Sequence, residues 1–463
     1  MTDTPIAAAS PGAIAERLAD AIARLRPEDV PDAVHHAVAN TVLDTIGLSI
    51  ASVGTDYGRA VRAANPGTGP CTAFGAEAPA DPFSAALING TTGHGEDYDN
   101  TYEGCPVHTG VVIVPALFAA GEAYGLPSDR VAFGMAVGIE VICRLGAVAH
   151  QGVHSAGFHP TSVLGTLGAA AGIAAARGFD ARQITDTLGV AGSMASGIIE
   201  YLADGSWTKR MHAGWAAQSG LRAATMGAAG FRGPVSVIEG SHGLFRAFAP
   251  STRPDYEAIL QDFGTRWEAA RVAFKPYACG TMTQPFIDCA VRLARRGIKA
   301  EAIEEVICYV GEGTVHRLWE PLALKQRPPT AYAAKFSGPY CVAAGFTFGD
   351  AGLAQFTETT IRDPQVLSLC GRVRFEVDPA DGYPLNYSGH VALRLKDGTV
   401  VEERQPQLRG GTREPLTRGD LLAKCAANLA FGGWLTGRAA DLARFADGLA
   451  GTAAPFSAAA FRR

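Results

Sequence analysis

The runs SDRVAFGMAVGIEVICRLGAVAH (128–150) and HPTSVLGTLGAAAGIAAARG (159–178) decide the fold that the sequence predicts. Both place apolar and small residues at three- and four-residue spacing, which is the period of an α-helix. Because glycine and alanine recur at this spacing, the two helix axes can approach each other closely. We therefore predict a bundle of tightly packed helices as the main core.

Helical periodicity extends on both sides of this pair, from about residue 11 to residue 266. A short strand-like segment, CTAFG (71–75), interrupts it. The other helical runs are IAERLADAIARL (14–25), AVHHAVANTVLDTIGLSIA (33–51), DPFSAALINGTTGHG (81–95), ITDTLGVAGSMASGIIEYL (184–202) and KRMHAGWAAQSGLRAATMGAAG (209–230).

The pattern changes to alternation after residue 270. Strands are predicted at EAIEEVICYVGEG (301–313) and RVRFEVD (372–378), and a hairpin at HVALRLKDGTVVEERQ (390–405), with a helix over TAYAAKFSGPYCVAAGF (330–346). The end of the chain is helical again, at 418–431 and 437–450. We predict a mainly α protein with a large all-helical domain formed by both chain ends (1–269 and 406–463) and a smaller inserted α+β domain (270–405).

Composition and charge exclude several classes of protein. The 463 residues are 47% hydrophobic and 18% charged, and the net charge of −5 gives no attraction to nucleic acid or to an anionic membrane. The apolar windows are broken by Pro115, Glu122, Glu140 and Arg144, so we expect no membrane span. Nine cysteines without a CxxC pair, and a start that lacks signal-peptide features, predict a cytoplasmic protein.

One polar stretch, NGTTGHGEDYDNTYEGCPVH (89–108), precedes a long apolar run. It holds His94, His108 and four acids at the edge of a segment that must be core, which favours perturbed ionisable groups. We interpret it as half of an active site. A solvated loop rich in glycine and aspartate is the alternative that its composition alone favours.

A second stretch, HQGVHSAGFHPTSVLG (150–165), places His159 immediately before a helix start. The positive end of that helix suits an anionic ligand. His150 and His154 have the four-residue spacing of zinc ligands on a helix, but Gly152 and Gly157 weaken the helix and no HExxH motif occurs. We therefore predict no metal site here.

Two further stretches supply cations. DGSWTKRMHAGWAAQSG (204–220) carries Lys209, Arg210 and His212 at the start of a helix, where cations need an anionic partner or solvent. An exposed basic helix cap is the alternative. FKPYACGTMTQPFIDCAV (274–291) places Lys275 and Tyr277 near the predicted junction of the two domains, which is a common position for a small-molecule pocket.

HGEDYDNT with a later histidine, FHPTSVLG, SWTKRMHAGWAAQSG and FKPYACG resemble, in order and spacing, the motifs of the MmgE/PrpD family. The resemblance covers nearly the whole chain. It implies a helical domain with an α+β lid, a homodimer, a pocket between the domains, no metal and no organic cofactor. The family's pocket positions fall on Asp97, Thr101, His108, His159, Lys209 and Lys275.

The motifs leave the reaction open among the family's dehydratase, decarboxylase and epimerase activities. The chain has CPVHTG where the family commonly has His-Pro, and the decarboxylase's lid tyrosine aligns near Lys325. We expect a cofactor-independent lyase that dehydrates a 2-methylcitrate-like polycarboxylate. A catalytically silent polycarboxylate-binding paralogue is the alternative from another class.

The expected roles follow from charge. Asp97 and His108 form the acid–base pair, and Lys209, Lys275 and His159 hold substrate carboxylates and stabilise negative charge. Thr101, Arg210, His212 and Tyr277 are further candidates for substrate binding. An iron–sulfur cluster is not expected, because the cysteines nearest the site are too widely spaced.

Overall fold

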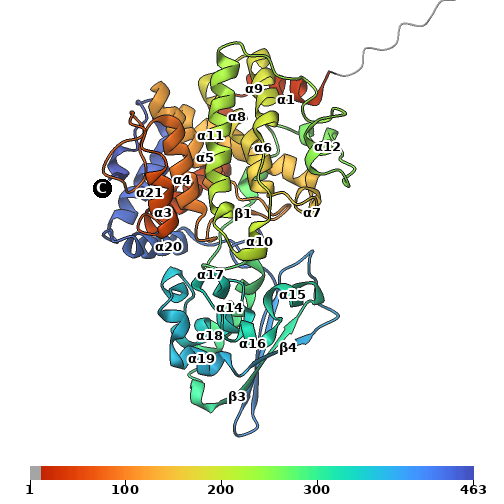
Figure 1. Ribbon diagram of the computed structural model, residues 1–463, viewed down its shortest axis with the longest axis vertical. Helices are drawn as coiled ribbons and strands as arrows, with labels where there is room; N and C mark the ends of the chain where they lie inside the picture. The colour runs from red at the N-terminus through yellow and green to blue at the C-terminus, as the bar shows by residue number, and fades with distance from the viewer. Residues whose placement is uncertain (1–11) are drawn as a thin grey trace, which may run out of the picture.

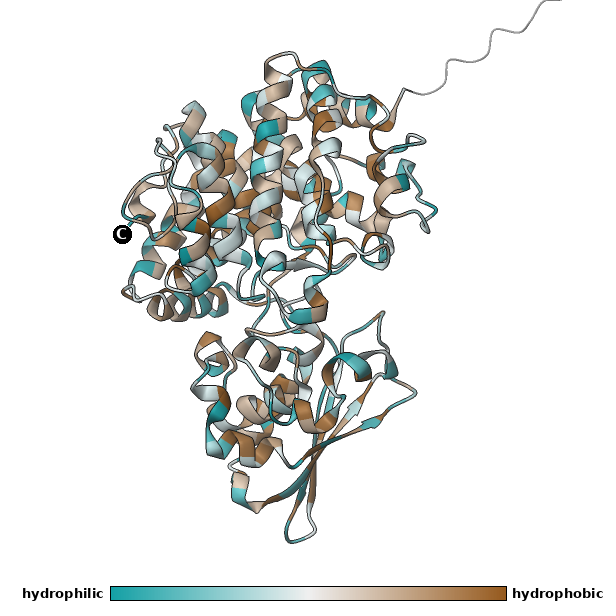
Figure 2. Ribbon diagram, viewed as in Figure 1, coloured by the Kyte–Doolittle hydropathy of each residue, from teal (hydrophilic) through white to brown (hydrophobic). Residues whose placement is uncertain are grey.

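The computed structural model describes residues 12–463, and this part of the chain is mainly helical, as the sequence predicts. Residues 1–11 lie outside the described residues. They include most of the start that lacks signal-peptide features and the beginning of the predicted segment 1–269. Figure 1 shows a larger helical lobe, which holds both ends of the described chain, and a smaller lobe with the long strands. Hydrophobic segments run through both lobes (Figure 2).

The two helices that decide the fold lie in the larger lobe as α6 (Ser128–Ala149) and α8 (Pro160–Arg177). A Cβ atom on Gly134 of α6 would lie 2.6 Å from the carbonyl oxygen of Gly172 in α8, so the predicted close approach is confirmed. The helices around them are α1 (Ile14–Arg24), α2 (Asp32–Ala51), α3 (Asp56–Ala63), α4 (Pro82–His94), α5 (Gly110–Tyr124), α7 (Gly152–Ser155), α9 (Ala181–Met194), α10 (Tyr201–Asp204), α11 (Thr208–Ala228), α12 (Leu244–Phe248) and α13 (Glu257–Leu260).

The smaller lobe contains a four-stranded sheet in the order β4-β3-β5-β6. Strands β3 and β4 are parallel, whereas β5 pairs antiparallel with β3 and β6, so the predicted strands and hairpin are confirmed. The strands are β3 (Ile303–Val310), β4 (Val373–Val377), β5 (Gly389–Leu395) and β6 (Val400–Gln405). The helices that accompany them are α14 (Gln284–Arg295), α15 (Val315–Leu318), α16 (Leu322–Lys325), α17 (Ala331–Ala334), α18 (Gly338–Phe348) and α19 (Pro364–Cys370).

Each lobe has a hydrophobic core of its own. The first core takes residues from 14 to 274 and again from 421 to 461, because α20 (Arg418–Phe431) and α21 (Arg438–Gly448) return to the larger lobe and α2 contacts both. The second core takes residues from 277 to 393, together with Leu48, Ala51 and Tyr98 of the larger lobe. The domain boundaries at residues 270 and 405 stay a prediction.

Three local predictions are wrong. The helix expected over 330–346 is split into α17 and α18, because Ser337 caps the second helix by accepting the N–H of Tyr340. The helix expected over 184–202 ends at Met194, and Gly197 adopts a φ of 113° before α10. No strand forms at CTAFG, where Cys71 makes only an isolated bridge to Ala80.

Helix α6 is long and apolar enough to cross a membrane by length and composition. However, 94% of its most apolar window is buried inside the folded chain. Glu140 and Arg144, which form an ion pair within this helix, are fully buried together. Burial against neighbouring helices therefore accounts for the apolar character of α6.

Candidate active site

Three helix ends of the larger lobe bring histidines to one buried point. His94 is the last residue of α4, His108 lies two residues before α5, and His159 is the N-cap residue of α8. The ring centroid of His94 lies 4.6 Å from that of His108 and 5.6 Å from that of His159. The backbone N–H of His108 donates to Oγ1 of Thr161, 3.0 Å away, which ties the start of α5 to α8.

Two more segments complete the site from distant parts of the sequence. Helix α11 lies against α4 because Gly214 has no side chain: a Cβ there would lie 2.1 Å from the Leu87 carbonyl oxygen. The first turn of α11 carries Lys209. Strand β1 (Thr101–Tyr102) pairs antiparallel with β2 (Val272–Ala273), so the residues after β2 lie beside the loop that precedes β1, and Lys275 is among them.

Asp97 is the centre of the cationic part of the site. Its two carboxylate oxygens lie 3.0 Å from Nζ of Lys275 and 3.0 Å from Nζ of Lys209. Lys275 also donates to the Asp97 carbonyl oxygen at 2.7 Å. The backbone of Asp97 has a φ of 53°, in a region that non-glycine residues seldom adopt and that recurs at functional sites.

Asp99, two residues further on, has imidazole partners instead of ammonium partners. Nδ1 of His94 is hydrogen-bonded to Asp99 at 3.0 Å, and Nδ1 of His108 lies 2.9 Å from Oδ2 of the same carboxylate. The His108 contact is short but is not aligned as a hydrogen bond. Nε2 of His108 lies 3.9 Å from Oδ1 of Asp97. The His108 ring therefore stands between the two carboxylates.

The set His94, Asp99 and His108 has the chemistry of a metal site, because its ligand atoms lie within 4.8 Å of one another. The carboxylate already contacts Nδ1 of both imidazoles, so the set is held together without an ion. Two ammonium groups on the nearby Asp97 also oppose the approach of a further cation. The expected absence of a metal stays a prediction.

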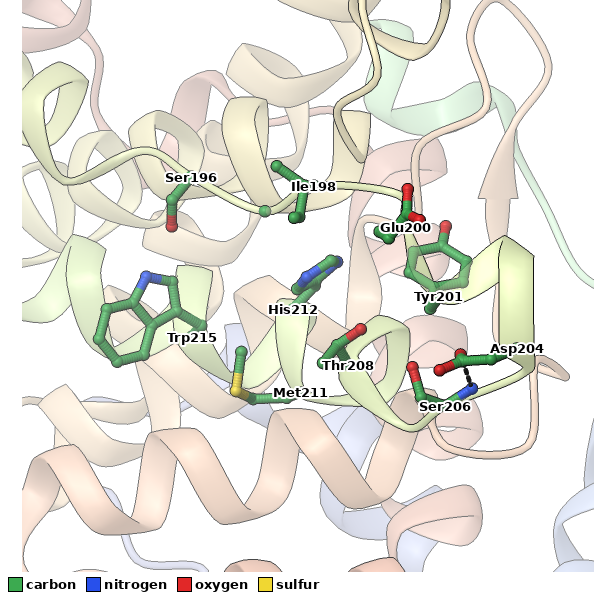
Figure 3. A pocket seen from close by; sticks show the side chains of 11 residues that line it. Ser196, Ile198, Glu200, Tyr201, Asp204, Ser206, Thr208, Met211, His212 and Trp215 are labelled. Carbon is green, nitrogen blue, oxygen red and sulfur yellow. Dashed lines mark hydrogen bonds between the residues drawn. The ribbon is translucent and has the colours of Figure 1, made fainter.

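His212 of α11 joins the histidine cluster from its other side. Its Nδ1 lies 3.2 Å from Nδ1 of His159, and both rings contact the ring of Tyr201. His212 and Tyr201 also line a cavity of about 530 Å³, shown in Figure 3. This cavity reaches the histidine cluster from the surface formed by α10 and α11.

Burial and charge set the protonation states. Burial alone would raise the pKa of Asp97, but Lys209 and Lys275 hold this pKa well below its usual value. Burial would lower the pKa of Lys209, whereas Asp97 holds it above its usual value. Burial lowers the pKa of His108 and of His212 to about 4, and that of His159 falls well below its usual value for the same reason. At neutral pH these three imidazoles are therefore neutral.

The smaller lobe contributes Tyr332 of α17 and Lys335, the residue that follows the end of this helix. Nζ of Lys335 donates to the Glu96 carbonyl oxygen at 2.7 Å and forms an ion pair with the Glu96 carboxylate. The guanidinium of Arg210 lies between two tyrosine rings, 4.4 Å from the centroid of Tyr57 and 4.7 Å from that of Tyr332. These contacts join the two lobes directly beside Asp97.

The structure brings most of the predicted site residues together. Thr101 is half-buried in β1, where it pairs with Ala273. Tyr277 is turned away: its hydroxyl donates to Asp288 at 2.8 Å, inside the smaller lobe. The predicted residues that form the cluster are Asp97, His108, His159, Lys209 and His212. Lys275 joins it through its ion pair with Asp97, and Arg210 lies beside it against Tyr57 and Tyr332.

The placements of three other residues, His150, His154 and Lys325, complete the comparison with the sequence. His150 ends α6 with a φ of 48°, and His154 lies in α7, so the two do not form a pair on one helix. Lys325 donates to the carbonyl oxygen of Phe336 within the smaller lobe. Sequence reasoning missed Asp99 and Tyr332. Asp99 is one of the four acids between His94 and His108, and its spacing does not distinguish it from the others, whereas nothing local marks Tyr332.

Buried ammonium groups beside neutral imidazoles have the chemistry to bind an anion and to transfer a proton. Comparison with known families identifies the class further. Residues 16–257 match the MmgE/PrpD N-terminal domain, and residues 277–438 match the MmgE/PrpD C-terminal domain. The chain belongs to the MmgE/PrpD family, and the resemblance seen in the motifs is confirmed.

Similar characterised proteins are cis-aconitate decarboxylases. The mouse enzyme is 26% identical over 435 residues, which cover 90% of this chain and 86% of the mouse protein. The human enzyme is 29% identical over 356 residues, or 75% of this chain and 72% of the human protein. That of Aspergillus terreus is 26% identical over 433 residues, or 86% of each chain.

Proposed function

We propose that the protein is a cofactor-independent lyase that acts on a di- or tricarboxylate. The observation that carries the proposal is the arrangement around Asp97. Two ammonium groups lie 3.0 Å from its oxygens, and the Nε2 atom of a neutral imidazole, His108, lies 3.9 Å away. A substrate carboxylate that enters here meets cations to hold it and a base to take a proton from the neighbouring carbon.

Dehydration of a 2-methylcitrate-like hydroxy acid fits these protonation states. Nε2 of His108 removes a proton from the carbon next to a carboxylate, and the electron pair forms the new carbon–carbon double bond as hydroxide leaves. The imidazolium of His108 then gives the same proton to the leaving hydroxide, which departs as water, while Lys209 and Lys275 keep their charge and hold the carboxylates. A neutral imidazole is the form that such a proton abstraction requires, and burial favours that form.

Decarboxylation of cis-aconitate is the second candidate, and the names of the similar proteins favour it. In that reaction a substrate carboxylate leaves as carbon dioxide and the carbanion left behind is protonated. Epimerisation next to a carboxylate, as with iminodisuccinate, needs only the proton transfer. All three reactions use the same stabilisation of negative charge by Lys209 and Lys275.

The test is incubation of EDTA-treated protein with citrate, 2-methylcitrate, cis-aconitate and iminodisuccinate in deuterated water, followed by proton NMR. An alkene formed from a hydroxy acid supports the dehydratase. Itaconate identifies the decarboxylase instead, and deuterium exchange or inversion without loss of mass identifies the epimerase. Binding of the compounds without any change in them would support the silent paralogue.

The same incubation tests the metal-free mechanism. A parallel sample receives zinc or magnesium after EDTA treatment, because His94, Asp99 and His108 form a possible ligand set. Equal turnover with and without added metal is the expected result. Turnover that depends on the added metal would overturn the cofactor-independent proposal.

The assembly and location of the protein belong to the same proposal. We expect a homodimer that uses the surface of α10 and α11, because Ile198, Met211 and Trp215 are 61%, 37% and 38% exposed around one cavity. Light scattering after gel filtration measures the mass, and Trp215→Glu should shift it towards the monomer. We also expect the smaller lobe to act as a lid, and the protein to act in the cytoplasm, which suits its nine unpaired cysteines.

A further inference from the structure

We propose that Asp99 is a positioning residue that fixes the tautomer and orientation of His108, and that this carboxylate, rather than Asp97, is the partner of the proton-transferring imidazole. The inference rests on the proposed function, since it gives His108 its chemical role. It replaces the expectation from the sequence that Asp97 is the residue paired with His108.

The contacts of Asp99 carry the first step. Its side chain is fully buried, and its Oδ2 lies 2.9 Å from Nδ1 of His108. That nitrogen is buried and has no hydrogen-bond partner within the described residues, so the nearby carboxylate is the group positioned to take its N–H. In unliganded sites such contacts are often poorly aligned and tighten when substrate binds.

The contacts of Asp97 exclude it from the same task. Each of its oxygens already has an ammonium partner at 3.0 Å, from Lys209 or Lys275. Its closest approach to His108 is 3.9 Å, at Nε2, which is beyond hydrogen-bond length. Asp97 therefore lies on the side of the ring where a substrate proton would be exchanged.

The chemistry follows from the different surroundings of the two nitrogens of the His108 ring. A carboxylate at Nδ1 favours the tautomer with a proton on Nδ1, which leaves the lone pair of Nε2 free to act as a base. When Nε2 takes a proton, the adjacent carboxylate stabilises the imidazolium that forms. Without that carboxylate, the tautomer protonated at Nε2 becomes accessible, and this tautomer cannot accept a proton there.

His94 holds Asp99 in place. Its Nδ1 is hydrogen-bonded to Oδ1 of Asp99 at 3.0 Å, and its ring stacks on His159 at an angle of 20°. Nδ1 of His94 also lies 3.1 Å from Oδ2 of Asp99, so His94 contacts both carboxylate oxygens, and Oδ2 in addition faces Nδ1 of His108. The position of the carboxylate is set before substrate arrives.

The first test is kinetic, with Asp99→Asn and the matched control Asp186→Asn. Asp186 is also a buried, ion-paired aspartate of the larger lobe, bound to Arg182 at 2.9 Å, but it lies on α9. For Asp99→Asn we expect turnover on the active substrate to fall by about 10- to 100-fold, with KM within about threefold. Asp186→Asn should keep its turnover. Thermal unfolding of both variants checks that each is folded.

The second test needs no activity, so it separates failure of this inference from failure of the proposed function. Proteins labelled with ¹⁵N at histidine report each ring's tautomer by NMR, and His108→Gln identifies the His108 signals. We expect a proton on Nδ1 of His108 in the native protein and a redistribution towards Nε2 in Asp99→Asn. An unchanged tautomer in the folded variant would overturn the role of Asp99, whatever the turnover. If no compound of the panel is converted, the tautomer still decides the inference while the proposed function fails.

Discussion

Asp97 and Asp99 lie two residues apart in one loop, are both buried, and have opposite surroundings. The partners of Asp97 are ammonium groups from α11 and from the segment after β2, more than 100 residues away in the chain. The partners of Asp99 are the imidazoles of His94 and His108, all within one short stretch. One carboxylate is held by fixed charges, the two ammonium groups, and the other by two imidazoles.

Residue type alone therefore does not assign a role in a buried site. The charges around Asp97 stay in place at any pH near neutrality, because its own pKa is depressed and that of Lys209 is raised. Beside Asp99, burial lowers the pKa of His108 to about 4, so its imidazole is neutral at neutral pH and is able to accept a proton. The first half suits charge stabilisation and the second suits proton transfer.

The largest effect is expected from the half with fixed charges. Lys275→Met removes one ammonium from Asp97 and should lower turnover by about 10³. A preorganised cation in a buried site stabilises the negative charge of the transition state strongly, because water does not screen it. Steady-state kinetics on the active substrate measures it. Lys325→Met is the control, since this half-buried lysine contacts carbonyl oxygens of the smaller lobe. Comparable losses in both variants would contradict the special role of the Asp97 pair.

A smaller effect is expected from the imidazole half. His108→Ala should lower turnover by about 10², the usual contribution of a general base, with little change in thermal unfolding. His242→Ala, at an exposed histidine, serves as the control. If His108→Ala retained near-normal turnover, proton transfer would have to be assigned to another group.

The two halves should also separate in their response to acid. The pKa of His108 is about 4 in the folded chain and about 6.5 when unfolded, so the unfolded chain binds more protons between these values. The free energy of unfolding therefore falls as the pH drops from 6.5 to 4, by at most about 3 kcal/mol for this residue. Urea unfolding at several pH values measures the slope.

His108→Gln should reduce that slope, because glutamine does not titrate. Asp97 behaves differently: its pKa is depressed, so its contribution is present above its usual pKa of 3.8 and is lost only at lower pH. An unchanged slope in His108→Gln would show that other groups govern the acid response.

The sequence predicts much of the fold because periodicity and small residues are local signals. The helices of the α6–α8 pair and the strands β3 to β6 lie where their patterns place them. The breaks inside 184–202 and 330–346 were missed. There a capping serine and a glycine with positive φ override a continuous apolar pattern.

The site is predicted less completely, since proximity in sequence is a weak guide to proximity in space. In the run Asp97-Tyr98-Asp99, the carboxylate of Asp97, whose φ is 53°, faces the lysines, whereas that of Asp99 faces the imidazoles. Tyr277 is two residues from Lys275, yet its hydroxyl pairs with Asp288 in the other lobe. Such choices depend on tertiary contacts that no local pattern records.

The smallest effect is expected where the Asp97 half meets the smaller lobe. Arg210→Lys keeps the charge next to Lys209 but loses the flat guanidinium between Tyr57 and Tyr332, a contact worth about 1 kcal/mol. We expect KM to rise about fivefold with little change in turnover number, because the closed arrangement of the two lobes is weakened. Arg222→Lys is the matched control on the same helix: its guanidinium lies 4.0 Å from the Phe83 ring centroid, within one lobe. Equal KM values in the two variants would mean that the stacking of Arg210 does not couple the lobes to substrate binding.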